Sequence, residues 1–182
     1  MEKPRMTERD TIEKVKDKQG ILSQIQNFFT LGYGTKEDLR ELDKKLRDLY
    51  YADLRDVRHV WENVYLGVLD AGVNVASRDL KKILQTLDIV MEKVNRADYG
   101  YAGLMDRKGH IREEELARVF DYDKTLGDHI ESLKEAVKKT QSDVEGENFP
   151  DVPADVKNVK GLLLALQDKW REREKGFRPL EI

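Results

Sequence analysis

One apolar stripe in the middle of the chain constrains the fold more than any other feature. Its residues recur every three or four positions, as Leu39, Leu42, Leu46, Tyr50, Leu54, Val57, Trp61, Val64 and Val68. Apolar residues at this spacing cover one face of an α-helix, so the stripe predicts a helix of about ten turns. Thr35 and Asp38 favour its start, and Gly72 can take the left-handed conformation that ends a helix.

Four further segments have helical periodicity, at 7–31, 77–108, 112–141 and 154–175, with an acidic loop at 142–153 before the last. Charged residues make up 38% of the chain and hydrophobic residues 39%, with four Pro in 182 residues, which is typical of helical bundles. No segment has the composition of an interdomain linker, so we expect one domain.

The predicted fold class is therefore all-α: an antiparallel (up-down-up-down) bundle of four long helices at 35–176. An additional N-terminal amphipathic helix and a Gly-Tyr-Gly loop precede it at 1–34, and a C-terminal tail follows at 177–182.

Pairing the stripes predicts which residues share a layer of the bundle. Two antiparallel helices rise by the same distance per residue on either side of their turn. Residues at the same height therefore have numbers that add up to a constant value, which we call the constant-sum rule. The rule places Tyr50 opposite Asp98, Asp98 opposite Asp123, and Asp123 opposite Trp170. It thereby predicts that the segment 112–141 packs against 154–175 as well as against 77–108.

One predicted layer places two aspartates in the interior of the bundle, where apolar residues are expected. This layer consists of Tyr50, Asp98, Asp123 and Trp170. Two successive steps of four at Leu46, Tyr50 and Leu54 also indicate an irregular seam there. A buried carboxylate costs several kcal/mol unless it is paired or strongly hydrogen-bonded.

Three interpretations of this layer stay open. The hydroxyl of Tyr50 and the indole N–H of Trp170 can donate to the aspartates and fix the register. One aspartate can instead turn to solvent or to a nearby arginine, of which the chain offers Arg47, Arg96 and Arg173. As a third interpretation, Asp98 and Asp123 hold a metal ion or shuttle a proton.

The segment 20–31 predicts an interaction surface. Its apolar residues lie on one side of the predicted helix, as Ile21, Leu22, Ile25, Phe28 and Phe29. Such a face can dock on the bundle, on another subunit or on a membrane surface. The polar side lacks the Lys and Arg residues that membrane binding favours, so docking within the protein or its oligomer is the preferred interpretation.

Two other patterns point to metals only weakly. The segment 106–116 matches part of an EF-hand loop, but Leu104 and Lys108 stand where carboxylate ligands are needed, so we expect no calcium there. One helical face carries three potential ligands that fit a solvated charged surface better, namely Asp56, His59 and Glu62.

Composition excludes several classes of function. The 33 basic and 36 acidic residues are mixed along the chain, so we expect no nucleic-acid partner. Cysteine is absent, and no nucleotide-binding or nucleophile motif occurs, so we expect no cofactor and infer no small-molecule substrate. Charged residues near the N-terminus and the lack of an apolar run of about 18 residues predict a cytoplasmic protein.

Every strong pattern in the sequence thus concerns helix packing. We expect a non-enzymatic helical interaction or scaffold protein that self-associates into an oligomer, with a second copy or another protein as partner. One alternative is a peripheral membrane protein that uses Phe28 and Phe29. A second alternative is a metal-dependent enzyme with Asp98 and Asp123 as ligands.

Overall fold

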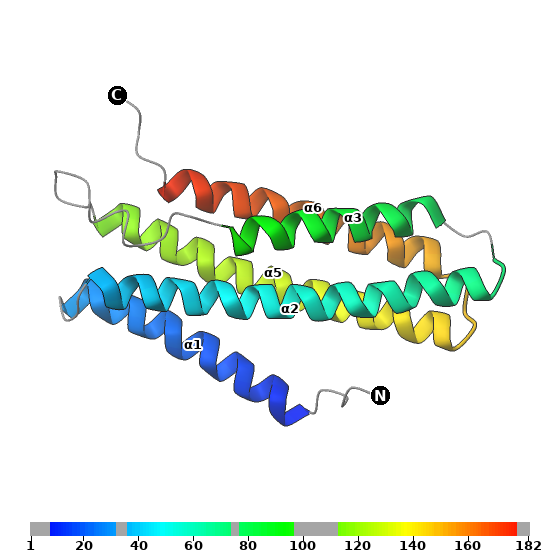
Figure 1. Cartoon of the computed structure of the whole chain (residues 1–182), viewed down its shortest axis with the longest axis horizontal. Coiled ribbons are helices and arrows are strands. Elements are labelled where there is room, and N and C mark those ends of the chain that lie inside the picture. The colour runs from blue at the N-terminus through cyan, green and yellow to red at the C-terminus, as the bar shows by residue number, and fades with distance from the viewer. Residues whose placement is uncertain (1–7, 32–35, 74–76, 97–112, 178–182) are drawn as a thin grey trace.

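The structure, a computed structural model, describes residues 8–31, 36–73, 77–96 and 113–177. These residues are almost entirely helical, and they contain no strand (Figure 1). The helices are α1 (Glu8–Leu31), α2 (Lys36–Asp70), α3 (Ser77–Asn95), α5 (Glu113–Glu145) and α6 (Val152–Phe177). The predicted fold, an antiparallel bundle of four long helices with an additional N-terminal helix, is confirmed.

The described ends of α2 lie where the sequence predicts them, and Thr35, the predicted N-terminal cap residue, lies outside the described residues. Glu37 and Asp38 lie in its first turn, where the partial positive charge of the helix N-terminus stabilises carboxylates. Gly72 has a φ of 65° at the other end, and its N–H donates to the carbonyl of Leu69 at 3.0 Å. Gly72 is therefore the left-handed cap residue that the sequence predicts, because glycine adopts this conformation without steric cost.

The loop between α5 and α6 is shorter than the predicted 142–153. The helix α5 continues to Glu145, and α6 already begins at Val152. Pro153 is accommodated in the first turn of α6, where its missing N–H has no helical partner to lose. The prediction was wrong because Pro153 was assigned to the loop instead of to a helix start.

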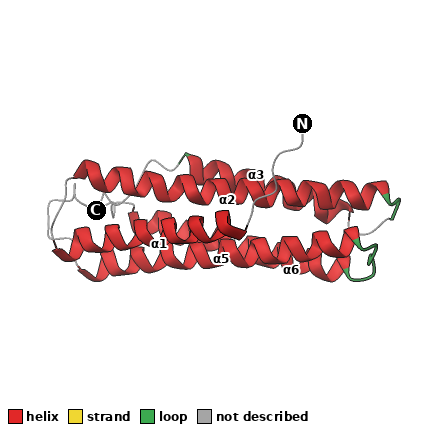
Figure 2. Ribbon diagram, turned by 90° about the horizontal axis from the view of Figure 1, so that it is seen from below, coloured by secondary structure: helices red, strands yellow, loops and turns green. Residues whose placement is uncertain are grey.

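The four long helices form two antiparallel hairpins, α2–α3 and α5–α6, which pack on each other as two layers (Figure 2). The helix α2 lies beside α5, and α3 lies beside α6. The two helices within each of these pairs are parallel to each other (Figure 1). Lys160 of α6 donates to Asp79 of α3 at 3.0 Å and joins the second pair.

The predicted packing of α3 against α5 is wrong for the described residues, because these two helices lie on a diagonal of the bundle and make no contact there. The constant-sum rule holds for any two antiparallel helices, whether they are neighbours or diagonal partners, so it cannot choose between the two. Asp98, which the prediction placed opposite Asp123, lies outside the described residues.

The core of the bundle contains the predicted stripe of α2. Its residues from Leu46 to Val68 are buried, and the indole N–H of Trp61 donates to the carbonyl of Leu80 on α3 at 3.0 Å. At the predicted irregularity, both Asp53 and Leu54 are buried. Asp53 lies three residues after Tyr50 and four before Val57, so a buried polar residue shares this part of the seam with Leu54.

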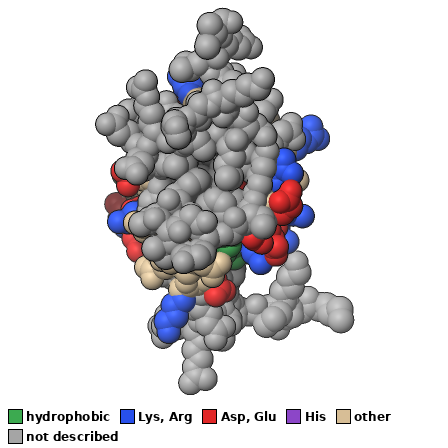
Figure 3. Space-filling view, turned by 90° about the vertical axis from the view of Figure 1, so that its left-hand side faces the viewer, with side chains coloured by type: hydrophobic (Ala, Val, Ile, Leu, Met, Phe, Trp, Pro, Cys, Tyr) green, Lys and Arg blue, Asp and Glu red, His purple; other side chains and the backbone are tan. Residues whose placement is uncertain are grey.

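The helix α1 packs on the outside of the four-helix bundle, against α2 and α5 (Figure 1). None of the described helices combines the length and apolar character needed to cross a membrane. Seen from the end of the bundle, the described acidic and basic side chains are interspersed around the rim (Figure 3).

Candidate functional site

The interior of the bundle contains a cluster of charged residues centred on Arg173 of α6, which is 1% exposed. Its Nε donates to Asp123 Oδ1 on α5 at 2.5 Å, and its Nη2 donates to Asp43 Oδ1 on α2 at 2.7 Å. Arg47 completes the set by donating to the other oxygen of Asp43 at 3.0 Å. We call these four residues the Arg173 cluster. Because α2 and α6 lie on a diagonal of the bundle, Arg173 spans its centre.

The charges of the Arg173 cluster balance, since two guanidinium groups face two carboxylates. Charge-assisted hydrogen bonds of this kind offset the cost of removing the ions from water. The guanidinium of Arg173 also lies 5.1 Å from the centre of the Trp170 ring, which adds a cation–π contact. The cluster therefore joins three helices without leaving a net buried charge.

The predicted polar layer has different hydrogen bonds from those expected. Tyr50, Asp123 and Trp170 are all buried. The Tyr50 hydroxyl donates to the main-chain carbonyl of Asp123 at 2.6 Å, and not to its carboxylate. The indole N–H of Trp170 donates to Glu174 at 3.1 Å. The carboxylate of Asp123 pairs instead with Arg173, one of the three arginines that the sequence offered.

Burial raises the pKa of the Tyr50 hydroxyl well above its ordinary value, and the nearby charge of Asp123 raises it further. The hydroxyl is therefore neutral at physiological pH and serves as a hydrogen-bond donor. A phenol held in this state is a poor proton shuttle, because transfer is most efficient for groups whose pKa lies near the working pH.

A second charged cluster lies where α1 meets α2 and α5. Lys18 of α1 pairs with the fully buried Asp53 of α2, and its Nζ lies 3.2 Å from Glu131 Oε1 on α5. Lys134 of α5 donates to Asp53 at 3.5 Å and to Glu131 at 3.1 Å. We call these four residues the Lys18 cluster. Its two lysines and two carboxylates also balance in charge.

The pKa shifts in the Lys18 cluster follow from this pairing. Burial disfavours the charge on Glu131, but Lys134 and Lys18 outweigh it and hold the pKa of Glu131 below its ordinary value. Burial also disfavours the charge on Lys134, but Asp53 and Glu131 outweigh it and raise the pKa of Lys134. Each group is therefore stabilised in its ionised form.

Tyr50 lies between the two clusters. Its hydroxyl contacts Asp123 of the Arg173 cluster, and its ring centre is 6.0 Å from the Lys18 ammonium. The clusters and Tyr50 together form a continuous polar seam that links α1, α2, α5 and α6. This seam is the candidate functional site.

Five residues of the seam were not predicted from the sequence, because Asp98 and Asp123 were the only charged residues selected at stripe positions; these five are Lys18, Asp43, Asp53, Glu131 and Lys134. Asp43 lies seven residues before Tyr50 and Asp53 lies three residues after it, and Arg173 continues the α6 stripe three residues after Trp170. Lys134 stands beside the buried Leu133. A search for charged residues at stripe positions would have found Asp43, Asp53 and Arg173.

The predicted interaction surface faces the bundle of the same chain. Ile25 is fully buried, and Ile21 and Leu22 are partly buried against the core. The side chains of Phe28 and Phe29 lie outside the described part of the structure. Beside this contact, a solvent-open pocket of about 410 Å³ runs between α1, α2 and α5 and includes Lys18 and Tyr50 in its lining.

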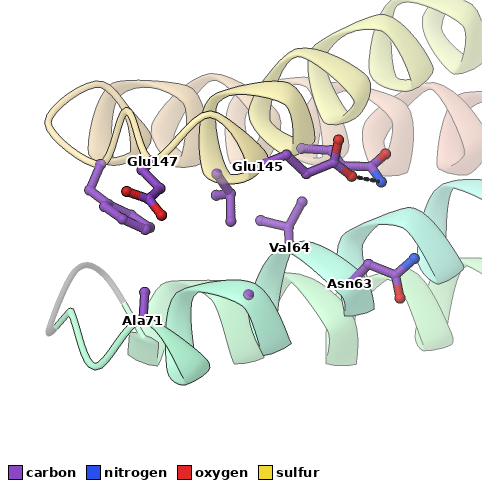
Figure 4. A pocket seen from close by; sticks show the side chains of 9 residues that line it. Asn63, Val64, Ala71, Glu145 and Glu147 are labelled. Atoms are coloured by element: carbon purple, nitrogen blue, oxygen red, sulfur yellow. Dashed lines mark hydrogen bonds between the residues drawn. The ribbon is translucent and has the colours of Figure 1, made fainter.

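Another pocket of about 470 Å³ lies between the C-terminal ends of α2 and α5 (Figure 4). The carboxylates of Glu145 and Glu147 lie on its α5 side, and Val64 and Ala71 lie on its α2 side. Gln141 donates to Glu145 at 2.7 Å. The pocket is open to solvent, and the polar seam does not extend into it.

The metal candidates from the sequence do not come together in the described ranges. No group of three or more His, Asp or Glu side chains with metal-binding geometry occurs among the residues that the structure describes. His59 is exposed, and Glu62 accepts a hydrogen bond from Arg58 at 3.1 Å. The EF-hand-like positions up to residue 112, like Asp98, lie outside the described residues.

Comparison of the chain with protein-family models, with curated proteins and with solved structures found no match in any of the three.

Proposed function

We propose that this chain is a non-enzymatic helical interaction protein that associates with itself through α1. The observation that carries the proposal is the contact of α1 with the bundle. Among the described side chains of α1, at 16–27, Lys18 and Ile25 alone are buried. The rest of the apolar core is built from α2, α3, α5 and α6, and Ile25 is the one described buried apolar side chain that α1 adds to it.

A contact of this kind is weak enough to open. Burying Ile25 contributes roughly 2–3 kcal/mol. Undocking α1 also takes Lys18 away from the buried Asp53, which is costly, but Lys134 of α5 stays paired with Asp53. The helix α1 can therefore leave while α2, α3, α5 and α6 keep their contacts with one another, and the contacts of Ile25 and Lys18 are regained when α1 docks on a second copy.

The seam supports an interaction role over a chemical one. In both clusters, each charged side chain pairs with an opposite charge on another helix or one turn away. Groups paired in this way hold helices in register, as buried polar residues do in other helical assemblies. Their arrangement is that of a structural contact surface.

Energy transfer between labelled full-length chains tests the proposal. Because the chain has no cysteine, Gln24→Cys on α1 and Asp48→Cys on α2 each provide one labelling site, and both positions are exposed. We expect transfer between a donor-labelled Q24C chain and an acceptor-labelled D48C chain, rising with concentration alongside a dimer mass in light scattering.

The matched control is an acceptor at Lys157→Cys, an exposed position on α6, a helix that makes no contact with α1 in the structure. Transfer to this position should be weaker than transfer to D48C. A monomer mass at every concentration, with no transfer in either mixture, would refute self-association.

A further inference from the structure

We propose that the groove between α2 and α5 is a docking site for the α1 helix of a second copy, and that Asp53 and Glu131 select this helix by its Lys18. The inference rests on the self-association proposed above and names the partner and the residues that recognise it. It treats α1 in the structure as the same helix docked within its own chain.

The groove between α2 and α5 has an excess of negative charge when α1 is absent. Without α1, the part of the Lys18 cluster that belongs to the bundle holds Asp53, Glu131 and Lys134, which leaves one negative charge in excess. Asp53 is fully buried, so an uncompensated charge there is costly. A docking helix that brings a single lysine to this position restores neutrality.

The helix α1 presents a lysine and apolar residues at the spacing that this groove requires. Lys18 is followed by Ile21, Leu22 and Ile25, so the lysine and three apolar residues at +3, +4 and +7 lie on one helical face. No other lysine in the sequence is followed by apolar residues at all three of these positions. Of all the segments in this chain, α1 is therefore the one that fits the groove.

The contact of α1 with the groove is incompletely packed, which favours exchange of α1 between two chains. A pocket of about 410 Å³ remains between α1, α2 and α5, lined on the α1 side by the polar Gln19, Ser23 and Gln26. This part of the contact is open rather than closely packed. Reciprocal exchange of α1 between two chains fills both grooves and gives a closed dimer with two-fold symmetry.

Charge reversal in two full-length variants provides the test. In Lys18→Asp, α1 carries a carboxylate toward a groove that keeps its excess negative charge. In Asp53→Lys, the groove becomes positive toward an unchanged Lys18. We expect each variant alone to be a monomer whose α1 amides exchange rapidly with solvent. Mixed in equal amounts, the two should form a heterodimer of twice the monomer mass, because each α1 then meets a groove of opposite charge.

Two controls make the result decisive. The double variant K18D/D53K restores opposite charges within one chain and should regain slow amide exchange in α1, which shows that the substitutions permit folding. The half-exposed pair of Lys160 and Asp79 on α6 and α3 is reversed in the same way, with K160D mixed with D79K, and should give no heterodimer.

A mixture of K18D and D53K that stays monomeric, while the double variant protects α1, would overturn the inference. A heterodimer formed equally well by the K160D and D79K pair would also overturn it. These outcomes are distinct from failure of the proposed function, which the wild-type labelling assay reports on its own. Wild-type transfer without a charge-selected heterodimer rejects Asp53 as the selecting residue but leaves self-association in place.

Discussion

Replacing Arg173 with Met removes the cation that joins Asp123 on α5 to Asp43 on α2 while keeping a side chain of similar length beside Trp170. Arg173 is 1% exposed and Asp123 is 0% exposed, so solvent cannot compensate for the lost guanidinium. Removing one partner of a buried pair costs about 3–5 kcal/mol of unfolding free energy. For a chain of 182 residues, this corresponds to a fall in Tm of roughly 6–20 °C.

Chemical and thermal denaturation of the variant, followed by circular dichroism, measure this loss. The matched control is Arg171→Met on the same helix, where Arg171 pairs with Asp168 at 3.1 Å and both side chains are more than half exposed. Exposed pairs of this kind contribute about 0–1 kcal/mol. The variant R171M should therefore unfold close to the wild type.

A second substitution tests the physical reason for the loss. Asp123→Leu in the R173M background removes the buried carboxylate as well as its partner, while Asp43 keeps its bond with Arg47. Replacing a buried ion pair with apolar residues is often neutral or stabilising, so the double variant should recover most of the lost stability. The reasoning is wrong if R173M is as stable as R171M, or if the double variant is less stable than R173M.

Two further predictions concern packing and pH. A Cβ added at Gly67 would lie 2.8 Å from Val144 Cγ1, so Gly67→Ala should lower the unfolding free energy by about 1–3 kcal/mol. A Cβ added at Gly161 would have no atom within 4 Å, so Gly161→Ala should raise the unfolding free energy by about 0.5–1 kcal/mol. Urea titrations measure both changes. The lowered pKa of Glu131 makes its stabilising contribution present above the ordinary value of 4.5 and lost as the pH falls. The raised pKa of Lys134 makes its contribution present below 10.5 and lost as the pH rises further. Amide protection of α1 should thus fall on acidification, and Glu131→Gln should flatten this dependence.

Equal stability of the two glycine variants would contradict the close contact between α2 and α5 that the first of these predictions assumes. Unchanged acid dependence in Glu131→Gln would show that another carboxylate controls the docking of α1.

Much of the fold follows from local patterns that a single sequence contains. The stripe from Leu46 to Val68 predicts α2 because helical periodicity is a property of neighbouring residues. The end of α2 at Gly72 follows from the conformational freedom of glycine. These features depend on a few residues at a time, and the structure has them where they were predicted.

The arrangement of the helices depends on distant residues and could not be predicted in the same way. The rule that paired Asp98 with Asp123 treats helices that follow each other in the chain as neighbours, but the bundle places α5 beside α2. The sequence offered three arginines as partners for an aspartate, and the structure shows that Arg173 pairs with Asp123. Arg173 reaches Asp43 across the bundle because its side chain is long, and no periodic pattern encodes such a contact.

The seam joins segments far apart in the chain, which bears on the order in which the protein folds. Arg173 and Asp43 are 130 positions apart, and Lys134 and Asp53 are 81 positions apart, whereas each hairpin is built from consecutive helices. Contacts between nearby segments form first, because closing a long loop costs more entropy. A hairpin awaiting its partner thus exposes hydrated charges along the surface it will later bury. These charges slow the final docking step, because they must lose water, and they keep half-folded chains from adhering to one another.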